Sequence, residues 1–580
     1  MFTPKLFSTL QQYDRAQLIA DLQAGVTVGI VALPLAMAFA IACGLPPERG
    51  LFTAIVAGFL ISALGGSRVQ IGGPTGAFVI LVSNVVAQYG YTGLVYSTIL
   101  AGGFLIALGI FRMGALIKFI PFPVTTGFTT GIAVVIFTTQ IKDFFGLRME
   151  TPPTEFIPKW NAYFQHFSTL NMSAAGLGVG CILLILLVRK NFPRLPAMLI
   201  AMSAMTLIAA LFHLDVETIG SRFGDLPRTL PNPSLPPFEW SMLSDLISPA
   251  FTIGLLAAIE SLLSATVSDG MIGGRHRPNI ELIAQGVANI ASACFGGIPA
   301  TGAIARTATN VKSGAKTPVA GMVHAVTLAF LLLFFAPLAK MIPLAVLAGI
   351  LIVVSYNMSE FKHFFSILKA PRSDVMVLLS TFTLTVLVDL TVAVQVGVVL
   401  ASLLFIRRMA EVTSVGMITR ELQDVGEDAN DPNSIVLRNV PDDVEVYEVH
   451  GPFFFGAADR FHETMRRISK SVKVIILRIR NVYAIDATGL HLLSEFHRQC
   501  QREGTQLVLS GVHAQPLVAL QRSGLWDEIG EDNIKGNIDD ALNRAREVLG
   551  LPLEPSPVPF RATVARESRL QKLHPPNSKG

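Results

Sequence analysis

The sequence predicts an all-α membrane domain of about fourteen apolar segments, followed by a small α/β domain. Three observations support this fold class. The 580 residues are 51% hydrophobic and 15% charged, with a mean hydropathy of +0.54, whereas ordinary soluble domains contain about 25% charged residues. A motif rich in glycine and proline occurs twice, near residues 75 and 301, each time after a long apolar segment. After Arg408 the composition becomes polar and strand-like alternation begins.

The membrane domain is expected over residues 17–409, after a short amphipathic segment, 1–16. Apolar segments long enough to span or half-span a bilayer fall near 18–44, 51–65, 74–89, 92–111, 120–141, 171–188, 196–212, 247–267, 279–295, 301–311, 318–338, 342–357, 374–388 and 391–406. Basic residues gather after every second segment, as at Arg189, Lys190 and Arg407. The positive-inside rule therefore places both termini on the cytoplasmic side of the cell inner (cytoplasmic) membrane.

The repeated motif reads Gly-Gly-Pro-Thr-Gly-Ala at 72–77 and Gly-Gly-Ile-Pro-Ala-Thr-Gly-Ala at 296–303. Its Thr-Gly-Ala triplets begin at Thr75 and Thr301, 226 residues apart. This offset relates segments one to seven to segments eight to fourteen. Because seven is odd, the second half must start from the opposite side of the membrane, and the sequence predicts two inverted repeats.

Each copy is predicted to open a half-helix inside the bilayer. The first N–H groups of such a helix are unpaired, and together with the positive end of the helix dipole they suit an anion. Two half-helices that face each other would form one anion site. The expected substrate-binding residues are Leu35, Phe39, Thr75, Gly76, Ala77, Phe78, Thr301, Gly302 and Ala303. The alternative is that the motif only kinks two spanning helices, but a matched pair in both halves favours the binding site.

An acid at membrane depth predicts a function, and Glu260 lies in the apolar run Gly254-Leu-Leu-Ala-Ala-Ile-Glu-Ser-Leu-Leu-Ser. Ser264 lies four residues further on, on the same helix face. The two are predicted to bind a coupling cation, or Glu260 to carry a proton. Arg306, one turn into the second half-helix, would add positive charge beside the anion and neutralise Glu260 when no substrate is bound. The alternative is that Arg306 and Glu260 form a purely structural ion pair.

Other features exclude several classes of protein. The net charge of +4 gives no support for a nucleic-acid partner. The sequence has no phosphate loop, paired catalytic carboxylates or metal cluster, so no enzyme, ATP-driven pump, metal or other cofactor is expected. The four cysteines follow no metal or disulfide spacing, and the first apolar run is too long for a signal peptide. His324 is expected to be a packed core residue, and Asp143, Asp269 and Asp389 to be solvated or to cap helices.

The soluble region is expected over 434–549, after a linker at 410–433 and before a disordered Pro-rich tail at 550–580. Strands are predicted from Val444, Val472 and Leu507, and helices over 456–469 and 488–503. This order implies a partly parallel sheet in an α/β domain.

Several motifs in order resemble the SulP (sulfate permease) family of anion transporters, namely Pro34-Leu-Ala-Met-Ala-Phe-Ala, Gly50-Leu-Phe-Thr-Ala, Gly73-Pro-Thr-Gly-Ala and Glu281-Leu-Ile-Ala-Gln-Gly through to Ala305-Arg-Thr. The soluble region resembles that family's STAS domain at Asn481-Val-Tyr-Ala-Ile-Asp-Ala-Thr-Gly-Leu. Within the family, Gly302-Ala-Ile-Ala-Arg, Ala257-Ala-Ile-Glu-Ser-Leu-Leu and Asn357-Met-Ser-Glu are most similar to the bacterial C4-dicarboxylate transporter.

The resemblance implies fourteen spans in a core and a gate domain, substrate between segments 1, 3, 8 and 10, an elevator-like movement and a homodimer. Two departures from the family's pattern bear on the substrate and on the coupling ion. Leu35 stands where many sulfate-type members have Gln, and Ile304 stands where sodium-coupled bicarbonate members have Thr, so proton coupling is expected rather than sodium. In anti-sigma-factor antagonists, which are soluble relatives of the STAS domain, a phosphorylated serine directly follows the aspartate that corresponds to Asp486. Ala487 stands at that position here. Asp486 and Thr488 are therefore only candidate regulatory residues, and contact with a cytosolic protein is the alternative.

The leading hypothesis is a secondary active transporter for proton-coupled uptake of small inorganic or organic anions such as C4-dicarboxylates. Sulfate or bicarbonate, carried by symport or exchange, remain open as substrates. An anion channel on the same scaffold is a second class, which the buried acid disfavours because a channel needs no coupling residue. A third class is a membrane-tethered regulator, which the duplicated half-helices disfavour because a tether needs no binding site.

Overall fold

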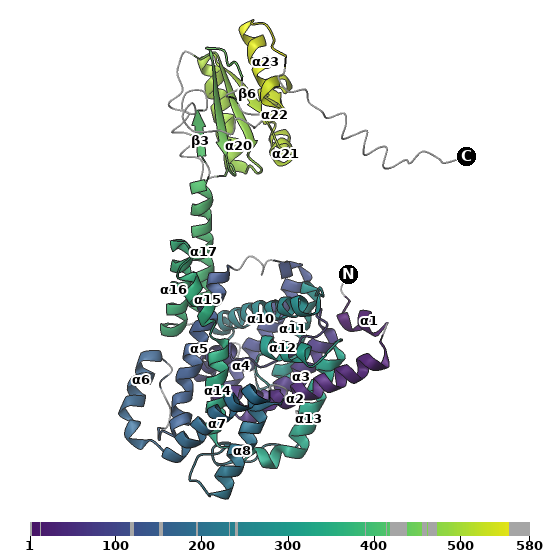
Figure 1. Cartoon of the computed structure of the whole chain (residues 1–580), viewed down its shortest axis with the longest axis vertical. Coiled ribbons are helices and arrows are strands. Elements are labelled where there is room, and N and C mark those ends of the chain that lie inside the picture. The colour runs from purple at the N-terminus through teal and green to yellow at the C-terminus, as the bar shows by residue number, and fades with distance from the viewer. Residues whose placement is uncertain are drawn as a thin grey trace, which may run out of the picture. The chain divides into compact units, whose positions relative to one another are not determined.

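The computed structural model describes residues 3–11, 13–115, 121–149, 153, 155–192, 195–230, 232–237, 242–388, 390–412, 414–417, 435, 438–454, 461 and 472–555. The chain divides into two compact units, residues 1–401 and 402–580, and each is taken by itself. The first unit is helical apart from one short strand pair, and the second contains a sheet (Figure 1).

Most helices of the first unit fall on the expected apolar segments, and the short helices at 5–10, 156–165, 219–223 and 361–367 lie outside them. The helices of this unit are α1 (Lys5–Leu10), α2 (Arg15–Ala42), α3 (Pro47–Leu64), α4 (Phe78–Ile110), α5 (Phe122–Phe145), α6 (Phe156–Gln165), α7 (Met172–Asn191), α8 (Ala197–Leu211), α9 (Ile219–Phe223), α10 (Leu243–Ile272), α11 (Pro278–Cys294), α12 (Ile304–Lys312), α13 (Val319–Ala339), α14 (Leu344–Met358), α15 (Phe361–Ile367), α16 (Arg372–Leu387) and α17 (Leu390–Val412), which runs into the second unit. Within the described residues, eight helical stretches are long and apolar enough to cross a membrane. The predicted polytopic helical domain is confirmed.

Helix α4 contains two expected segments, 74–89 and 92–111, in one element. Its arms meet at Gly90, whose φ of 66° and ψ of −173° interrupt the helix. Positive φ is accessible to glycine at little cost. The chain can therefore turn from the short first arm into the long second arm without a loop.

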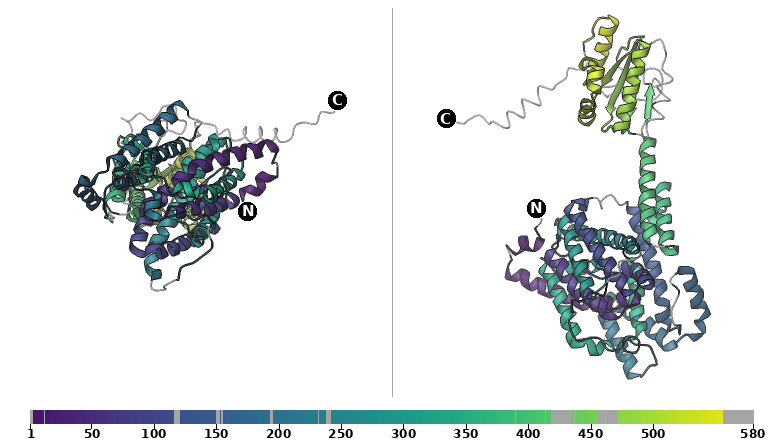
Figure 2. Two further views of the ribbon diagram at one scale, coloured as in Figure 1. Left: turned by 90° about the horizontal axis from the view of Figure 1, so that it is seen from below. Right: turned by 180° about the vertical axis from the view of Figure 1, so that it is seen from behind.

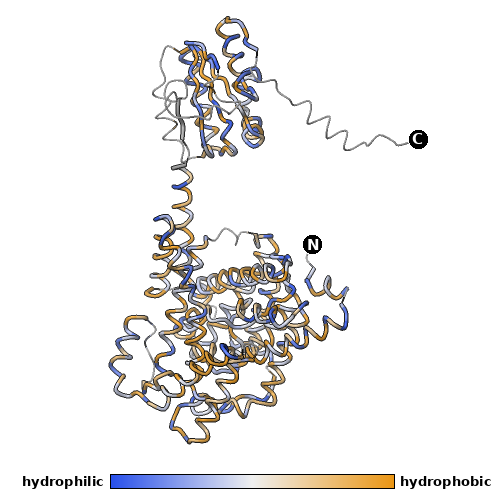
Figure 3. Tube along the Cα trace, in the orientation of Figure 1, coloured by the Kyte–Doolittle hydropathy of each residue, from blue (hydrophilic) through white to orange (hydrophobic). Residues whose placement is uncertain are grey.

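The helices form two bundles that touch each other. In one bundle α4 packs against α10 and α11, α13 packs against α2 and α3, and α12 lies against α10. In the other bundle α5 packs against α14 and α16, and α7 packs against α8 and α14. Figure 2 shows these helices from two further directions, and Figure 3 shows apolar residues along most of their length. Helices that are apolar on all sides are typical of membrane spans.

The second unit contains a five-stranded sheet in the order β3-β4-β5-β6-β7. Its strands are β3 (Ser414–Met417), β4 (Val444–His450), β5 (Val474–Asn481), β6 (Gln506–Ser510) and β7 (Ile534–Lys535), and only β3 runs antiparallel to its neighbour. The helices are α20 (Ala487–Glu503), α21 (Ala514–Ser523), α22 (Leu525–Ile529) and α23 (Ile538–Leu549). The predicted α/β domain is confirmed.

The expected linker needs a correction. β3 lies inside residues 410–433 and pairs with β4 from Ser414↔His450 to Met417↔Tyr447, so part of this range belongs to the sheet. Residues 418–434, the expected helix at 456–469 except Phe461, and most of the expected tail, 556–580, lie outside the described residues.

A charged cluster is buried between β4 and β5. Glu448, 1% exposed, accepts hydrogen bonds from Arg480 at 2.9 Å and Asn481 at 3.0 Å. It also pairs with the guanidinium of Arg478, itself 1% exposed, at 3.3 Å. Breaking such a pair leaves an uncompensated buried charge, which costs far more than losing the pair's own attraction.

We therefore expect Glu448→Ala to destabilise the sheet by about 3–5 kcal/mol. Hydrogen exchange of the β4 and β5 peptides in the full-length protein measures this directly. Glu445→Ala on the same strand is the control, because the Glu445 carboxylate is paired with the Tyr447 hydroxyl at 2.9 Å rather than with a guanidinium, and its loss should cost about 1.5–3 kcal/mol. Equal protection loss in both variants would contradict the role given to the cluster.

Candidate anion-binding site

The two copies of the repeated motif meet in the first bundle. β1 (Gly72–Gly73) pairs antiparallel with β2 (Thr301–Gly302), with Gly72 opposite Gly302 and Gly73 opposite Thr301. The amide N–H of Ala303 also donates to the carbonyl of Ile71 at 2.8 Å. We call this pair of strands the crossing. A short antiparallel pairing satisfies backbone groups that no helix satisfies at this depth.

Helix α10 lies against the crossing and binds both strands. The Thr301 hydroxyl donates to the Ala257 carbonyl at 3.0 Å. The Gln70 amide donates to the Ser261 carbonyl at 3.1 Å. The Thr75 hydroxyl donates to Oε2 of Glu260 at 2.9 Å. The two motif copies are thus fixed to one helix.

Two helices begin at the crossing, α4 at Phe78 and α12 at Ile304. Their N-cap residues, Ala77 and Ala303, offer no side-chain oxygen to the first N–H groups. The Ile304 side chain is 42% exposed, although Thr301, Gly302 and Ala303 before it are buried. The helix dipole gives both N-termini partial positive charge, which favours an anion. The first two amides of α4, those of Phe78 and Val79, donate to the carbonyls of Thr75 and Gly76 at 3.3 and 3.0 Å.

Arg306 adds a full positive charge at the same place. Its side chain is 3% exposed, and Nη2 donates to the carbonyl of Pro74. Nη1 is buried, and nothing in the described part of the chain bonds to it. It faces Gly73, where a Cβ would lie 2.6 Å from Nη1 and where φ is +149°. A buried guanidinium with a free donor is costly, so this group suits an arriving anion.

The expected pairing of Arg306 with Glu260 does not occur. Arg306 bonds to Pro74 and Glu260 bonds to Thr75, and no ion pair joins the two side chains, both of which are described. Glu260 is partly exposed, as is Thr75. Ser264, expected to act together with Glu260, donates its hydroxyl to Thr307 on α12 at 3.1 Å.

Of the remaining expected residues, Phe39 lies beside the start of α4. Leu35 and Phe39 lie one turn apart on α2, 8% and 4% exposed. A Cβ at Gly76 would lie 3.3 Å from the Phe39 ring, 2.8 Å from the sulfur of Met358 and 2.9 Å from Ile136. Met358 and Ile136 belong to the second bundle, so the start of α4 lies where the two bundles meet.

Sequence reasoning missed the residues that hold the crossing in place. Thr307 accepts from the Ile71 amide at 3.0 Å, and the Asn289 side chain bonds both the N–H and the carbonyl of Ala300 at 2.8 and 2.9 Å. The signal that could have identified them is the presence of polar side chains within membrane helices, because such side chains face other parts of the protein rather than lipid.

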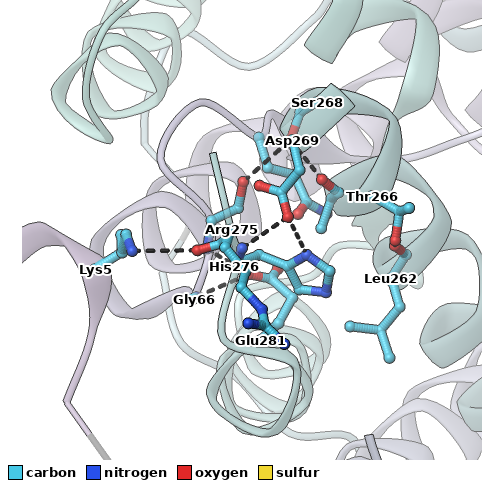
Figure 4. A network of polar contacts seen from close by, with 12 residues as sticks. Lys5, Gly66, Leu262, Thr266, Ser268, Asp269, Arg275, His276 and Glu281 are labelled. Carbon is cyan, nitrogen blue, oxygen red and sulfur yellow. Dashed lines mark hydrogen bonds and ion pairs between the residues drawn. The ribbon is translucent and has the colours of Figure 1, made fainter. Parts of the chain in front are cut away.

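A second network holds the chain between α3 and β1. Glu281 on α11 accepts from the amides of Gly66 and Ser67 at 2.8 and 3.1 Å. Nearby, Asp269 accepts from the His276 amide at 2.7 Å, and Lys5 donates to the Arg275 carbonyl at 3.2 Å (Figure 4). These contacts fix the loop that carries the first motif.

Residues expected outside the anion site take structural positions. Asp143 forms an ion pair with Arg222 at 2.7 Å, and His324 is fully buried. In the second unit the Asp486 carboxylate caps α20 by accepting from the Gly489 amide at 2.8 Å. Thr488 lies in the first turn of α20, partly exposed.

Comparison with known proteins identifies the family. The pattern of the "Sulfate permease family" matches residues 18–381, and that of the "STAS domain" matches residues 436–541. The chain belongs to the sulfate permease family. As a family member it is a multi-pass anion transporter with a STAS domain, and not an enzyme.

Individual relatives span nearly the whole chain. The Bacillus subtilis protein named "Putative sulfate transporter YvdB" is 41% identical over 91% of this chain and 98% of its own length. The "Bicarbonate transporter BicA" of Picosynechococcus is 28% identical over 92% of this chain and 95% of its own length. These names apply to the relatives themselves.

Solved structures agree with the fold. SLC26A9 superposes with a TM-score of 0.83 at 18% identity, covering 98% of this chain and 94% of that chain. The transmembrane domain of a cyanobacterial BicA superposes with a TM-score of 0.60 at 29% identity, covering 69% of this chain and 100% of that chain. The helical membrane domain followed by a STAS domain is therefore the fold of this family.

The crossing leaves no room for a side chain at Gly302, where a Cβ would lie 1.6 Å from Nε2 of Gln70. We expect Gly302→Leu to lower anion uptake into proteoliposomes by at least about 100-fold, because it displaces the start of α12. Gly103→Leu is the control, since Gly103 on α4 has nothing within 4 Å of its Cβ position. Normal uptake by a folded Gly302→Leu protein would contradict the site.

Proposed function

We propose that this transporter takes up small anions by proton symport, with C4-dicarboxylates as its substrate class. The observation that carries the proposal is the buried Arg306 Nη1 without a partner in the described residues, beside two uncapped helix N-termini. The guanidinium and the two helix N-termini all favour a bound group with negative charge. A carboxylate or other oxyanion seated there would accept hydrogen bonds from a guanidinium and from backbone amides.

The substrate class rests on sequence. The stretches around Glu260, Gly302 and Asn357 resemble the C4-dicarboxylate transporter, and Leu35 differs from the Gln of sulfate-type members. Leu35 and Phe39 give the site an apolar wall, which suits the methylene groups of a dicarboxylate better than it suits sulfate. Sulfate and bicarbonate stay as alternatives because relatives carry those names.

Glu260 is the proposed proton carrier. Its only hydrogen bond in the described structure comes from Thr75 at 2.9 Å, the residue that precedes the start of α4. Glu260 is partly exposed but lies among apolar residues of α10 and has no cation partner in the described structure, and these surroundings disfavour its charged form. A substrate anion bound at the crossing adds negative charge nearby and so favours the protonated acid. By linkage the proton then favours the anion, which is the requirement for symport.

Other parts of the proposal rest on sequence patterns. We propose that both termini are cytoplasmic in the cell inner membrane, that the halves are inverted repeats, and that the protein is a homodimer. The STAS domain is proposed to bind a cytosolic protein partner, with Asp486 and Thr488 as candidate regulatory residues. A channel is less well supported than a transporter, because a channel has no use for an acid hydrogen-bonded to the anion site.

Arg306→Gln should weaken anion binding by about 2 kcal/mol, since it removes a charge-assisted hydrogen bond. This corresponds to about a 30-fold higher dissociation constant. Calorimetric titration of the purified protein with succinate, sulfate and bicarbonate measures the loss and ranks the substrates. Arg544→Gln is the control, because Arg544 bonds Glu547 at 2.9 Å on α23 of the second unit and takes no part in either proposed anion site. An unchanged affinity in Arg306→Gln would sink the proposed site.

Glu260→Gln should still bind succinate but lose its response to a proton gradient. With the membrane potential clamped at zero, one proton per anion gives about tenfold accumulation per pH unit in the wild type. Uptake rises as external pH falls, because protonation from outside favours anion binding. The variant should show none of this accumulation, and Asp245→Asn at the exposed start of α10 should keep it. A wild-type requirement for sodium would refute proton coupling.

A further inference from the structure

A large cavity lies away from the crossing, and the proposed function does not use it. Its volume is about 1020 Å³. It is enclosed by the end of α2, the first arm of α4, the ends of α5 and α6, the start of α7 and the segment around α9. It therefore lies between the two bundles. By the predicted topology α2 ends on the outer side of the membrane, so the cavity opens to the outside.

The charges that line this cavity are unevenly paired. They are Lys142, Asp143, Arg148, Lys159, Asp215, Glu217 and Arg222, four basic and three acidic side chains. Arg222 uses two of the acids, bonding Asp143 at 2.7 Å and Glu217 at 2.5 Å. Asp215 is exposed. The lining therefore carries one more basic than acidic side chain.

Lys159 is the unusual member of this group. Its side chain is 8% exposed and borders the cavity, yet within the described residues it has no ion-pair or hydrogen-bond partner. Burial lowers the pKa of its ammonium group. A lysine this deeply buried is normally paired, and because no residue in the described part of the chain pairs with Lys159, a bound anion can take that place.

Tyr163 stands beside Lys159 on α6. The two residues are four positions apart, so they share one helix face. Tyr163 is 2% exposed and also lines the cavity, and the described structure gives its hydroxyl no partner. Burial raises the pKa of Tyr163, so the phenol stays a neutral donor. One face of α6 thus offers an ammonium group and a hydroxyl to the same space.

We propose that this cavity contains a second anion site, in which an oxyanion bonds to Nζ of Lys159 and to the hydroxyl of Tyr163. The site would load anions from outside before they reach the crossing. The cavity also borders Ser83 on the first arm of α4, five residues after the start of that helix and hence about 7.5 Å along it. The loading role rests on the proposed direction of uptake, whereas anion binding at Lys159 is independent of that direction.

Trp160 gives a local readout. The chain has three tryptophans, and the Trp160 ring lies 6.1 Å from that of Tyr163. A full-length protein carrying Trp240→Phe and Trp526→Phe therefore reports binding beside Lys159 through Trp160 fluorescence. Succinate and sulfate are titrated as probes. Adding Gly302→Leu to this protein blocks the crossing and leaves the outer cavity intact.

We expect both probes to change Trp160 fluorescence saturably, with or without Gly302→Leu. Lys159→Gln should raise the dissociation constant at least about tenfold, as expected for loss of a charge-assisted hydrogen bond, whereas Lys159→Arg should restore most of the affinity. In uptake assays Lys159→Gln should raise KM and leave kcat unchanged. Lys340→Gln is the matched control, since Lys340 pairs with Asp225 at 3.1 Å outside this cavity.

Three outcomes would overturn the inference. One is a fluorescence response that disappears with Gly302→Leu, which would assign the signal to the crossing and leave the proposed function standing. Another is an unchanged affinity in a folded Lys159→Gln protein. The third is a fall in kcat at unchanged KM in that variant, which would make Lys159 a structural residue.

Discussion

The backbone pairing of Gly72 and Gly73 with Gly302 and Thr301 is the constraint on which the rest of the membrane domain depends. Where two segments of the chain interrupt their helices inside a bilayer, their peptide groups must form hydrogen bonds without water. The backbone of each motif copy does so by pairing with the backbone of the other copy. The helices that follow, α4 and α12, then start at the same place with their N-terminal amides free of side-chain caps.

The neighbouring side chains follow from this constraint. The three hydrogen-bonding groups of Thr301, Gln70 and Thr75 all reach α10, and Asn289 and Glu281 reach the flanking loops from α11. Movement of one strand relative to α10 would break hydrogen bonds that no solvent replaces. The starts of the two half-helices are therefore fixed to α10, and near Gly76 they lie against Met358 and Ile136 of the second bundle.

The fold and the meeting of the two motifs could be predicted from the sequence, whereas the individual side-chain partners could not. Apolar length determines the segments, and repetition determines which two of them correspond. Helix spacing placed Ser264 beside Glu260, but Thr307 on another helix takes its hydroxyl. Similarly, Arg306 donates to the Pro74 carbonyl and forms no ion pair with Glu260. β3 was missed because four residues carry too little pattern, and its partner β4 defines it.

The lack of space at Gly302 has a consequence for selectivity. Because neither strand of the crossing has room for added side-chain atoms there, the groups left to attract an anion in the proposed site are backbone amides and one guanidinium, which accept any oxyanion of suitable charge. In that site, discrimination would fall to neighbouring apolar side chains such as Phe39, which respond to the length and width of a ligand rather than to its charge. Substitutions in these side chains would then broaden or narrow the range of substrates while the groups that attract negative charge stay the same.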